Sequence, residues 1–426
     1  MQIDIKNIGL IKNASINLNG LTIIAGENDS GKSTIGKLLF SIVKAFSRHK
    51  EEFEEDRESN IRNIVDNIYF RLRRKTNFDE NIEIRKLFHP MYFLDDINLK
   101  GIEAVNDRIE EIEKNNIDSS IHDLLVKLKK ILVQEDNEID SIRNAFKKIS
   151  YSEFSDDIIN RKSKEANVVI TENANSILEI KISNNNTCDV HLYDDLLFND
   201  ATIIETPMVL NYQESIYKAR AFFEPRDKDE ILRSLGVANI PLHVKDLDMK
   251  LRGSIYGSRD SNKHKTSSDI DNVVNGRVLY NHRKREFEFA RKNNDIYQIL
   301  NVASGIKAFG ILQMLINGNF MDGRSLLIID EPEVHLHPKW QLEYVKVIVE
   351  ICKIYDSKVI ITTHSPYIID AFETYSKENT EFYTSIRNEE DGSYNIEKVD
   401  NMNIIYEKLH EPFLNLEEDS LKDFKW

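Results

Sequence analysis

The stretch Gly26-Glu27-Asn28-Asp29-Ser30-Gly31-Lys32-Ser33, followed by Thr34, decides the fold of this chain. It matches a phosphate-binding loop, in which two glycines enclose a turn and a lysine and a hydroxyl residue follow. Glycine lets backbone N–H groups point at phosphate oxygens, and a helix that begins near Lys32 directs its positive end at them. We expect the Lys32 ammonium on the β- and γ-phosphates and the Ser33 hydroxyl on magnesium. The predicted nucleotide-binding residues are Gly26, Asn28, Ser30, Gly31, Lys32, Ser33 and Thr34.

The residues around this loop support that interpretation over an ordinary glycine turn. Leu21–Ala25 is a short apolar run that ends at the loop, as a buried strand of a parallel sheet does. After the loop, apolar residues recur at helical spacing, at Ile35, Leu38, Leu39 and Ile42. Strand, loop and helix therefore follow one another as phosphate binding requires.

A second motif, Leu326-Leu327-Ile328-Ile329-Asp330-Glu331-Pro332, is an apolar run that ends in two acids. Buried charges need partners, and a magnesium–ATP complex supplies one. We expect Asp330 to hold magnesium and Glu331 to orient or deprotonate the attacking water. A further apolar run, Val359–Thr363, ends at His364, which we expect to hydrogen-bond the γ-phosphate; a solvated loop histidine is the alternative. The catalytic candidates are Glu331, His364 and Lys32, and a helix between the two runs predicts a β-α-β unit with parallel strands.

Together these motifs resemble the ABC class of P-loop ATPases, in its SMC/RecF/OLD-like branch. The likeness also rests on Lys6-Asn7-Ile8-Gly9-Leu10-Ile11-Lys12, on Asp330-Glu331-Pro332-Glu333-Val334-His335-Leu336-His337-Pro338 and on Thr363-His364-Ser365-Pro366. The last two are similar to motifs of OLD-like and prokaryotic antiphage-defence ATPases. The resemblance implies an α/β ABC-type ATPase head, with a mainly parallel sheet, an antiparallel β lobe and a helical insertion. It also implies ATP and Mg²⁺ as cofactors.

The resemblance further implies a signature motif that a second subunit supplies in trans. Asn301-Val302-Ala303-Ser304-Gly305-Ile306-Lys307 lies where that motif belongs, with Ser304 as helix N-cap and Gly305 allowing close approach. Ile306 and Lys307 depart from the family pattern, and a capped core helix is the alternative. A homodimer or higher homo-oligomer with interfacial ATP sites follows if the motif works in trans. For the family's glutamine loop, both Gln213 and the turn Glu205-Thr206-Pro207 are candidates.

The periodicities predict an organisation around two halves of the head. Apolar stripes at Ile61–Ile68 and Ile121–Leu128 predict a helical insertion, and Arg277–Tyr280 with Glu286–Ala290 predicts a hairpin. The polar stretch Gly253–Gly276 favours a mobile loop. We expect a first head part with the phosphate loop over 1–46, the insertion over 47–160, returning strands over 161–215, a connecting region over 216–275, the second head part over 276–375 and a C-terminal segment over 376–426.

Composition limits the partners. The 426 residues carry a net charge of −15, which gives no global attraction for nucleic acid or anionic membranes. Basic clusters at Arg71–Lys75 and Arg283–Arg285 leave local nucleic-acid contact open, beside the default of a solvated face. Two cysteines, an N-terminus without a signal-peptide pattern and the lack of a long apolar run favour a cytoplasmic protein without membrane contact.

Two function hypotheses follow from these motifs. In the first, the chain is an ATPase switch subunit that controls a partner effector, a nuclease or toxin encoded nearby, in antiphage defence. Only 62 residues follow His364, which is too few for the Toprim nuclease domain of OLD-type proteins. In the second, it is a RecF/SMC-like DNA-repair or chromosome-structure ATPase that binds DNA directly. A transporter subunit and a non-hydrolysing ATP-binding scaffold are weaker alternatives.

Overall fold

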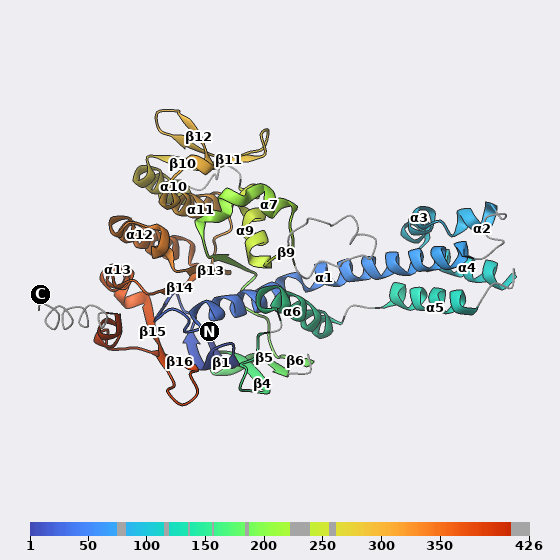
Figure 1. Ribbon diagram of the computed structural model, residues 1–426, viewed down its shortest axis with the longest axis horizontal. Helices are drawn as coiled ribbons and strands as arrows, with labels where there is room; N and C mark the ends of the chain where they lie inside the picture. The colour runs from blue at the N-terminus through green and yellow to red at the C-terminus, as the bar shows by residue number, and fades with distance from the viewer. Residues whose placement is uncertain are drawn as a thin grey trace, which may run out of the picture. The chain divides into compact units, whose positions relative to one another are not determined.

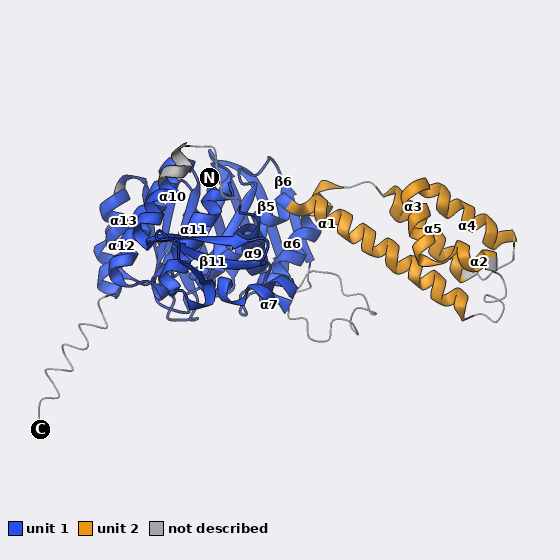
Figure 2. Ribbon diagram, turned by 90° about the horizontal axis from the view of Figure 1, so that it is seen from above, with its two compact units in different colours: residues 1–47, 142–224, 236–426 blue, residues 48–141, 225–235 orange. Residues whose placement is uncertain are grey.

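The computed structural model describes residues 1–74, 82–114, 119–134, 137–155, 157–183, 187–221, 239–254 and 261–409. The chain divides into two compact units (Figure 2). Unit 1 comprises Met1–Ser47, Ile142–Glu224 and Gly236–Trp426, and unit 2 comprises Arg48–Ser141 and Pro225–Leu235. In the described part of the chain, no helix is both long and apolar enough to cross a bilayer.

The described part of unit 1 contains an eleven-stranded sheet with the order β6-β5-β4-β1-β2-β16-β15-β3-β14-β13-β7 (Figure 1). Strands β15, β3, β14, β13 and β7 pair in parallel, whereas β6, β5, β4, β1 and β2 pair antiparallel. This is the expected combination of a parallel sheet and an antiparallel lobe. The strands are β1 Gln2–Ile8, β2 Ile11–Asn17, β3 Leu21–Ala25, β4 Glu165–Glu172, β5 Asn175–Ser183, β6 Thr187–Leu192, β7 Asp200–Ile204, β13 Ser325–Asp330, β14 Lys358–Thr363, β15 Thr380–Arg387 and β16 Tyr394–Lys398.

The central parallel strands β3, β14 and β13 are largely buried because helices cover both faces of the sheet. All five residues of β3 are buried, and alternate residues enter different cores. Ile23 packs in the core that α11, α12 and α13 complete, while Ile24 packs in the core that the start of α1 completes. The helices that flank the sheet are α1 Lys32–Arg73, α6 Glu138–Phe154, α9 Leu242–Gly253, α11 Ser304–Asn317, α12 Pro338–Tyr355 and α13 Pro366–Ser376.

The predicted β-α-β unit and hairpin are both confirmed. Strands β13 and β14 pair in parallel around α12, and β10 (Gly276–Asn281) pairs antiparallel with β11 (Glu286–Arg291), followed by β12 (Ile296–Gln298). Smaller elements precede them: the 3-10 helix η1 Pro207–Tyr212, α7 Gln213–Lys218 and the paired strands β8 Arg220–Ala221 and β9 Asn239–Ile240.

The expectation of a mobile loop over Gly253–Gly276 is wrong for its second half. Ser261–Val274 forms helix α10, although its sequence is mostly polar. Ile270 is fully buried in the core that α11 and α12 share. A short helix with few apolar residues gains its stability from such packing rather than from its own propensity, which explains why the pattern did not predict it.

Unit 2 is helical and has its own apolar core. It contains the part of α1 after Ser47, with α2 Ile82–Leu87, α3 Pro90–Lys100, α4 Ile102–Lys114 and α5 Ser119–Val133. Both predicted stripes enter this core, for example through Val65 and Ile68 of α1 and Leu125 of α5. The side chains of Arg71, Arg73 and Arg74 are exposed, and Lys75 lies outside the described residues.

Candidate nucleotide-binding and hydrolysis site

The phosphate-binding loop joins β3 to α1, and its two bracketing glycines are required by space and by backbone conformation. A Cβ on Gly26 would lie 1.9 Å from the Ser385 Oγ, so only glycine lets β15 approach. Gly31 has φ +83°, in the left-handed region, and a Cβ there would lie 2.9 Å from the Ile11 Cγ1. Within the loop, the Ser30 hydroxyl donates to the Glu27 carbonyl oxygen at 2.7 Å.

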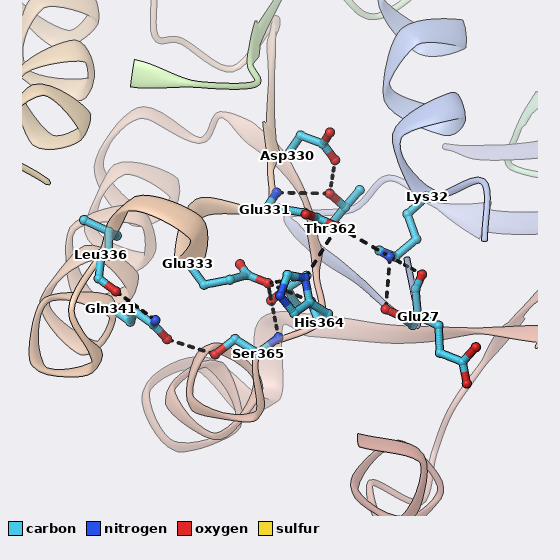
Figure 3. Close-up of polar contacts among 12 residues, drawn as sticks. Glu27, Lys32, Asp330, Glu331, Glu333, Leu336, Gln341, Thr362, His364 and Ser365 are labelled. Carbon is cyan, nitrogen blue, oxygen red and sulfur yellow. Dashed lines mark hydrogen bonds and ion pairs between the residues drawn. The ribbon is translucent and has the colours of Figure 1, made fainter. Parts of the chain in front are cut away.

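Lys32 is the buried cation of the site (Figure 3). Its side chain is only 3% exposed. The ammonium donates to the carbonyl oxygens of Gly26 at 3.0 Å and Glu27 at 2.5 Å, and lies 3.7 Å from a Glu331 carboxylate oxygen. Burial lowers the pKa of Lys32, and the charges of Glu331 and Asp330 oppose that shift. The loop thus holds a buried positive charge through two of its own carbonyl oxygens.

Ser33 and Asp330 meet across two elements that are far apart in sequence. The Ser33 hydroxyl, on the first turn of α1, donates to the Asp330 Oδ1 at 3.0 Å, and the Thr362 hydroxyl donates to the same oxygen. Burial raises the pKa of Asp330, while these two hydrogen bonds lower it. A hydroxyl and a carboxylate at this separation are hard oxygen donors, which fit Mg²⁺ with its remaining positions on water and phosphate.

Glu331 has a left-handed backbone, with φ 44° and ψ 59°. Such a conformation is costly for a residue with a side chain and persists only where its surroundings fix it. Here the Glu331 N–H donates to the Thr362 carbonyl oxygen at 3.0 Å. The bend turns the Glu331 carboxylate toward Lys32 and to 3.5 Å from the His364 Nδ1 (Figure 3). The residues predicted for catalysis therefore converge.

Glu333 is a residue of the site whose role sequence reasoning missed. It is buried, and its Oε1 accepts hydrogen bonds from the Thr363 hydroxyl and the His364 N–H, both at 2.7 Å. The same oxygen lies 3.3 Å from the His364 Nδ1. Glu333 thus anchors the segment after Asp330 to the end of β14. The acid two residues beyond the Asp-Glu pair was visible in the sequence, but nothing there indicated its burial.

The histidines near this segment have separate structural roles. The His335 Nε2 lies 3.1 Å from the Thr206 hydroxyl oxygen, and the His337 Nδ1 accepts the Lys339 N–H at 3.3 Å as the N-cap of α12. Among the residues that the structure describes, no three His, Cys, Asp or Glu side chains gather as a metal-binding group. A magnesium site here would thus depend on hydroxyl, water and phosphate oxygens beside Asp330.

The signature-like motif begins α11, with one difference from expectation. Ala303 is the N-cap and Ser304 the first helical residue, so Ser304 does not cap the helix with its side chain. Its hydroxyl points instead at the His335 carbonyl oxygen, at 3.5 Å. Gly305 is buried, and a Cβ there would lie 2.8 Å from the Trp340 ring. Close packing on α12 is therefore one reason for a glycine at this position.

The two glutamine-loop candidates differ in their surroundings. The Gln213 side-chain oxygen accepts the Phe287 N–H at 3.1 Å, which ties it to β11. Glu205 follows β7, whose Ile204 is in register with Ile329, so Glu205 lies at the same sheet edge as Asp330. A hydrogen bond from His243 lowers the pKa of Glu205 to about 2, and the charge of Glu205 contributes to the raised pKa of Asp330. Both candidates, Gln213 and the turn Glu205-Thr206-Pro207, remain predictions.

The remaining predicted residues have less specific surroundings. Asn28 is exposed in the loop, and the Thr34 N–H donates to the Gly31 carbonyl oxygen at 3.1 Å. In the second basic cluster, the Arg283 backbone N–H donates to the Asn281 Oδ1 at 3.1 Å, and Lys284 pairs with Glu288 at 2.6 Å. That lysine charge is engaged within the hairpin.

Comparison with known proteins assigns the family. The family model AAA_21, described as "AAA domain, putative AbiEii toxin, Type IV TA system", matches residues 21–370. Over 50 residues the chain is 40% identical to Septu protein PtuA of Bacillus thuringiensis. This match covers 12% of this chain and 12% of that protein.

Two solved structures resemble the fold at low identity. The SMC head bound to the C-winged helix domain of ScpA is 12% identical with a TM-score of 0.44, over 95% of this chain and 98% of that one. The SMC head domain from Thermotoga maritima is 11% identical with a TM-score of 0.39, over 94% and 98%.

Proposed function

This chain belongs to the AAA_21 family of AAA-domain proteins, and on that premise we propose that it is a magnesium-dependent ATPase that acts as the switch subunit of an antiphage defence system. ATP clamps two copies together, and hydrolysis releases them. The paired state controls a partner effector, a nuclease or toxin encoded nearby. The motif resemblance to defence ATPases and the short match to Septu protein PtuA support the defence role.

One observation carries the ATPase proposal: three parallel strands bring all the chemical groups to one edge. Strand β14, which ends next to His364, pairs with β3 on one side and with β13 on the other, so the phosphate loop, His364 and the Asp330–Glu331 pair follow three neighbouring strands. Carboxyl ends of adjacent parallel strands form the ligand site of open α/β sheets. The contacts from Ser33 to Asp330 and from Lys32 to Glu331 close this edge around the phosphate loop.

Each side chain has a separable task in the proposed reaction. Lys32 exchanges its carbonyl acceptors for the β- and γ-phosphate oxygens of ATP. Ser33 and Asp330 would hold magnesium, which would neutralise phosphate charge. Glu331 orients the attacking water and accepts its proton. The His364 Nδ1 faces Glu331 and Glu333, which leaves the opposite ring nitrogen for the γ-phosphate.

Dimerisation would complete the site from the other side. In this proposal Ser304 and Gly305 of a second copy bind the γ-phosphate at the start of α11, where backbone N–H groups are free of helix partners. Contact between Ser304 and the His335 backbone connects this helix start to the segment that follows Glu331. One protomer's hydrolysis segment and its signature would therefore respond together.

Light scattering tests the dimer directly. Glu331→Gln protein should be a monomer alone and a dimer with Mg-ATP, because it binds ATP without hydrolysing it, while wild type should dimerise only transiently. A mutant that stays monomeric with ATP bound would remove Ser304 and Gly305 from the site. A dimer that forms equally without ATP would contradict ATP-driven assembly.

The effector role needs a cellular test. Co-expression of this chain with the product of the adjacent gene should lower phage plating, and Lys32→Ala should abolish that protection. Protection that survives Lys32→Ala would separate the defence role from ATP binding.

A further inference from the structure

We call the sheet edge at the ends of β7 and β13, where Glu205 and Asp330 lie, the magnesium edge. Next to Glu205, His243 is buried between two carboxylates. It lies at the start of α9 and is 1% exposed. Its Nδ1 lies 2.5 Å from the Glu153 Oε2, and its Nε2 lies 3.3 Å from the Glu205 Oε2. Both ring nitrogens are therefore engaged, one toward the interior and one toward the candidate site.

Glu153 is a fixed support for this ring. Its side chain is fully buried, and its second oxygen, Oε1, accepts a hydrogen bond from the backbone N–H of His243 at 3.1 Å. The neighbouring Ser152 hydroxyl accepts the Leu242 N–H at 2.9 Å. The end of α6 thereby satisfies the first N–H groups of α9, which a helix cannot satisfy itself. The imidazole is thus held through its backbone and its ring.

Glu205 receives a cation on each of its two oxygens. Its Oε2 faces His243, and its Oε1 lies 3.7 Å from the Lys37 ammonium of α1. Its side chain is 41% exposed, so it stays open to the sheet edge where Asp330 lies. Two opposed contacts fix the orientation of a carboxylate that one contact would leave free to rotate.

We propose that His243, clamped by Glu153, is a positioning residue that holds the Glu205 carboxylate at the magnesium edge and thereby strengthens magnesium–nucleotide binding. The inference rests on the proposed ATPase function and extends it to His243 and Glu153, which no motif contains. Groups that hold the surroundings of a metal commonly change metal affinity by about 10- to 100-fold when removed.

A pair of substitutions separates positioning from a structural role. In His243→Asn, the side-chain amide can take the place of Nδ1, so the contact with Glu153 is kept and the contact with Glu205 is lost. In His243→Gln, the side-chain amide can take the place of Nε2, so the contact with Glu205 is kept and the contact with the Glu153 Oε2 is lost. The measurement is the magnesium concentration that gives half-maximal binding of a fluorescent ATP analogue, which needs no turnover, and thermal unfolding checks that each variant is folded.

If His243 acts by positioning Glu205, the half-saturating magnesium concentration should rise about 10-fold or more in His243→Asn and less than about 3-fold in His243→Gln. Exposed His282 provides the control, since His282→Asn should match wild type. A larger effect of His243→Gln than of His243→Asn would overturn the proposal in favour of a purely structural tie to Glu153.

Glu205→Gln keeps the test decisive if both histidine variants unfold, because this side chain is partly exposed. It should raise the half-saturating magnesium concentration about 10-fold or more, and an unchanged value would overturn the proposal. If wild-type protein binds no nucleotide in the presence of magnesium, the proposed ATPase function itself is contradicted. Failure of the positioning proposal and failure of the proposed function therefore give different results.

Discussion

Glu331→Gln should separate ATP binding from hydrolysis. Removing a general base lowers the rate by about 10²- to 10⁴-fold, which is about 3 to 5 kcal/mol of barrier. Binding should not suffer, because two carbonyl oxygens at 3.0 and 2.5 Å still hold Lys32. The substitution leaves the backbone contacts of residue 331 intact, since its N–H still donates to Thr362 and its carbonyl oxygen still accepts the Val334 N–H.

ATP binding should become tighter, by an amount that the ion pair limits. Glu331 and Lys32 lie 3.7 Å apart, which corresponds to about 1 kcal/mol of attraction in bulk water and about 4 kcal/mol at an effective dielectric constant of 20. Glu331 is 27% exposed, so solvent screens the pair toward the lower figure. Phosphates must replace this attraction, so we expect up to about 10-fold tighter binding in the mutant.

Single-turnover hydrolysis of radiolabelled ATP and titration of a fluorescent analogue measure the two effects separately. Glu343→Gln is the control, because that half-buried carboxylate of α12 pairs only with Lys346 in the described part of the chain, and its hydrolysis rate and nucleotide affinity should match wild type. A Glu331→Gln protein that binds ATP and hydrolyses it within about 3-fold of wild type would refute the assignment of the base.

Three further results follow from the same contacts. Lys32→Ala should weaken binding of the fluorescent analogue about 10- to 100-fold, since charged hydrogen bonds contribute about 1.5–3 kcal/mol; unchanged affinity would contradict the phosphate loop. Gly305→Ala should lower the free energy of unfolding in urea, because overpacking against Trp340 costs about 1–3 kcal/mol and outweighs about 0.5–1 kcal/mol of helix preference; higher stability would show that the ring moves freely. Burial lowers the pKa of His243, but hydrogen bonds to Glu153 and Glu205 raise it from 6.5 to about 9. Its stabilisation is therefore complete below pH 6.5 and is lost as the pH rises toward 9, by about 3 kcal/mol, and His243→Gln should show a flatter decline over this range in urea unfolding.

Local patterns predicted the parts of the fold in which sequence neighbours determine structure. Strands β3 and β13 could be predicted from the sequence because strands buried on both faces form nearly continuous apolar runs. The loop after β3 and the acids after β13 were readable because their chemistry needs fixed spacing. The predicted β-α-β unit makes β13 and β14 neighbours, and β14 also pairs with β3, which brings His364 near both motifs.

The parts that were missed depend on distant partners. Glu205 is 38 residues from His243, and His243 is 90 residues from Glu153, so no local pattern signals that the three meet. Helix α10 was missed because its burial depends on α11 and α12. Ser304 was misplaced by one residue because the sequence shows a good capping side chain but not that the His335 carbonyl would attract it.

The short segment after Asp330 connects these distant groups mechanically. Glu331 contacts Lys32 and His364 through its side chain, and Glu333 holds the end of β14. The His335 ring reaches Thr206, next to Glu205, and its carbonyl oxygen receives the Ser304 hydroxyl. A left-handed residue at the start of the segment has few alternative conformations, because its backbone is fixed by β14. In the proposed reaction, a change of contact at the γ-phosphate would therefore pass from residue 331 along this segment to Thr206 and Ser304.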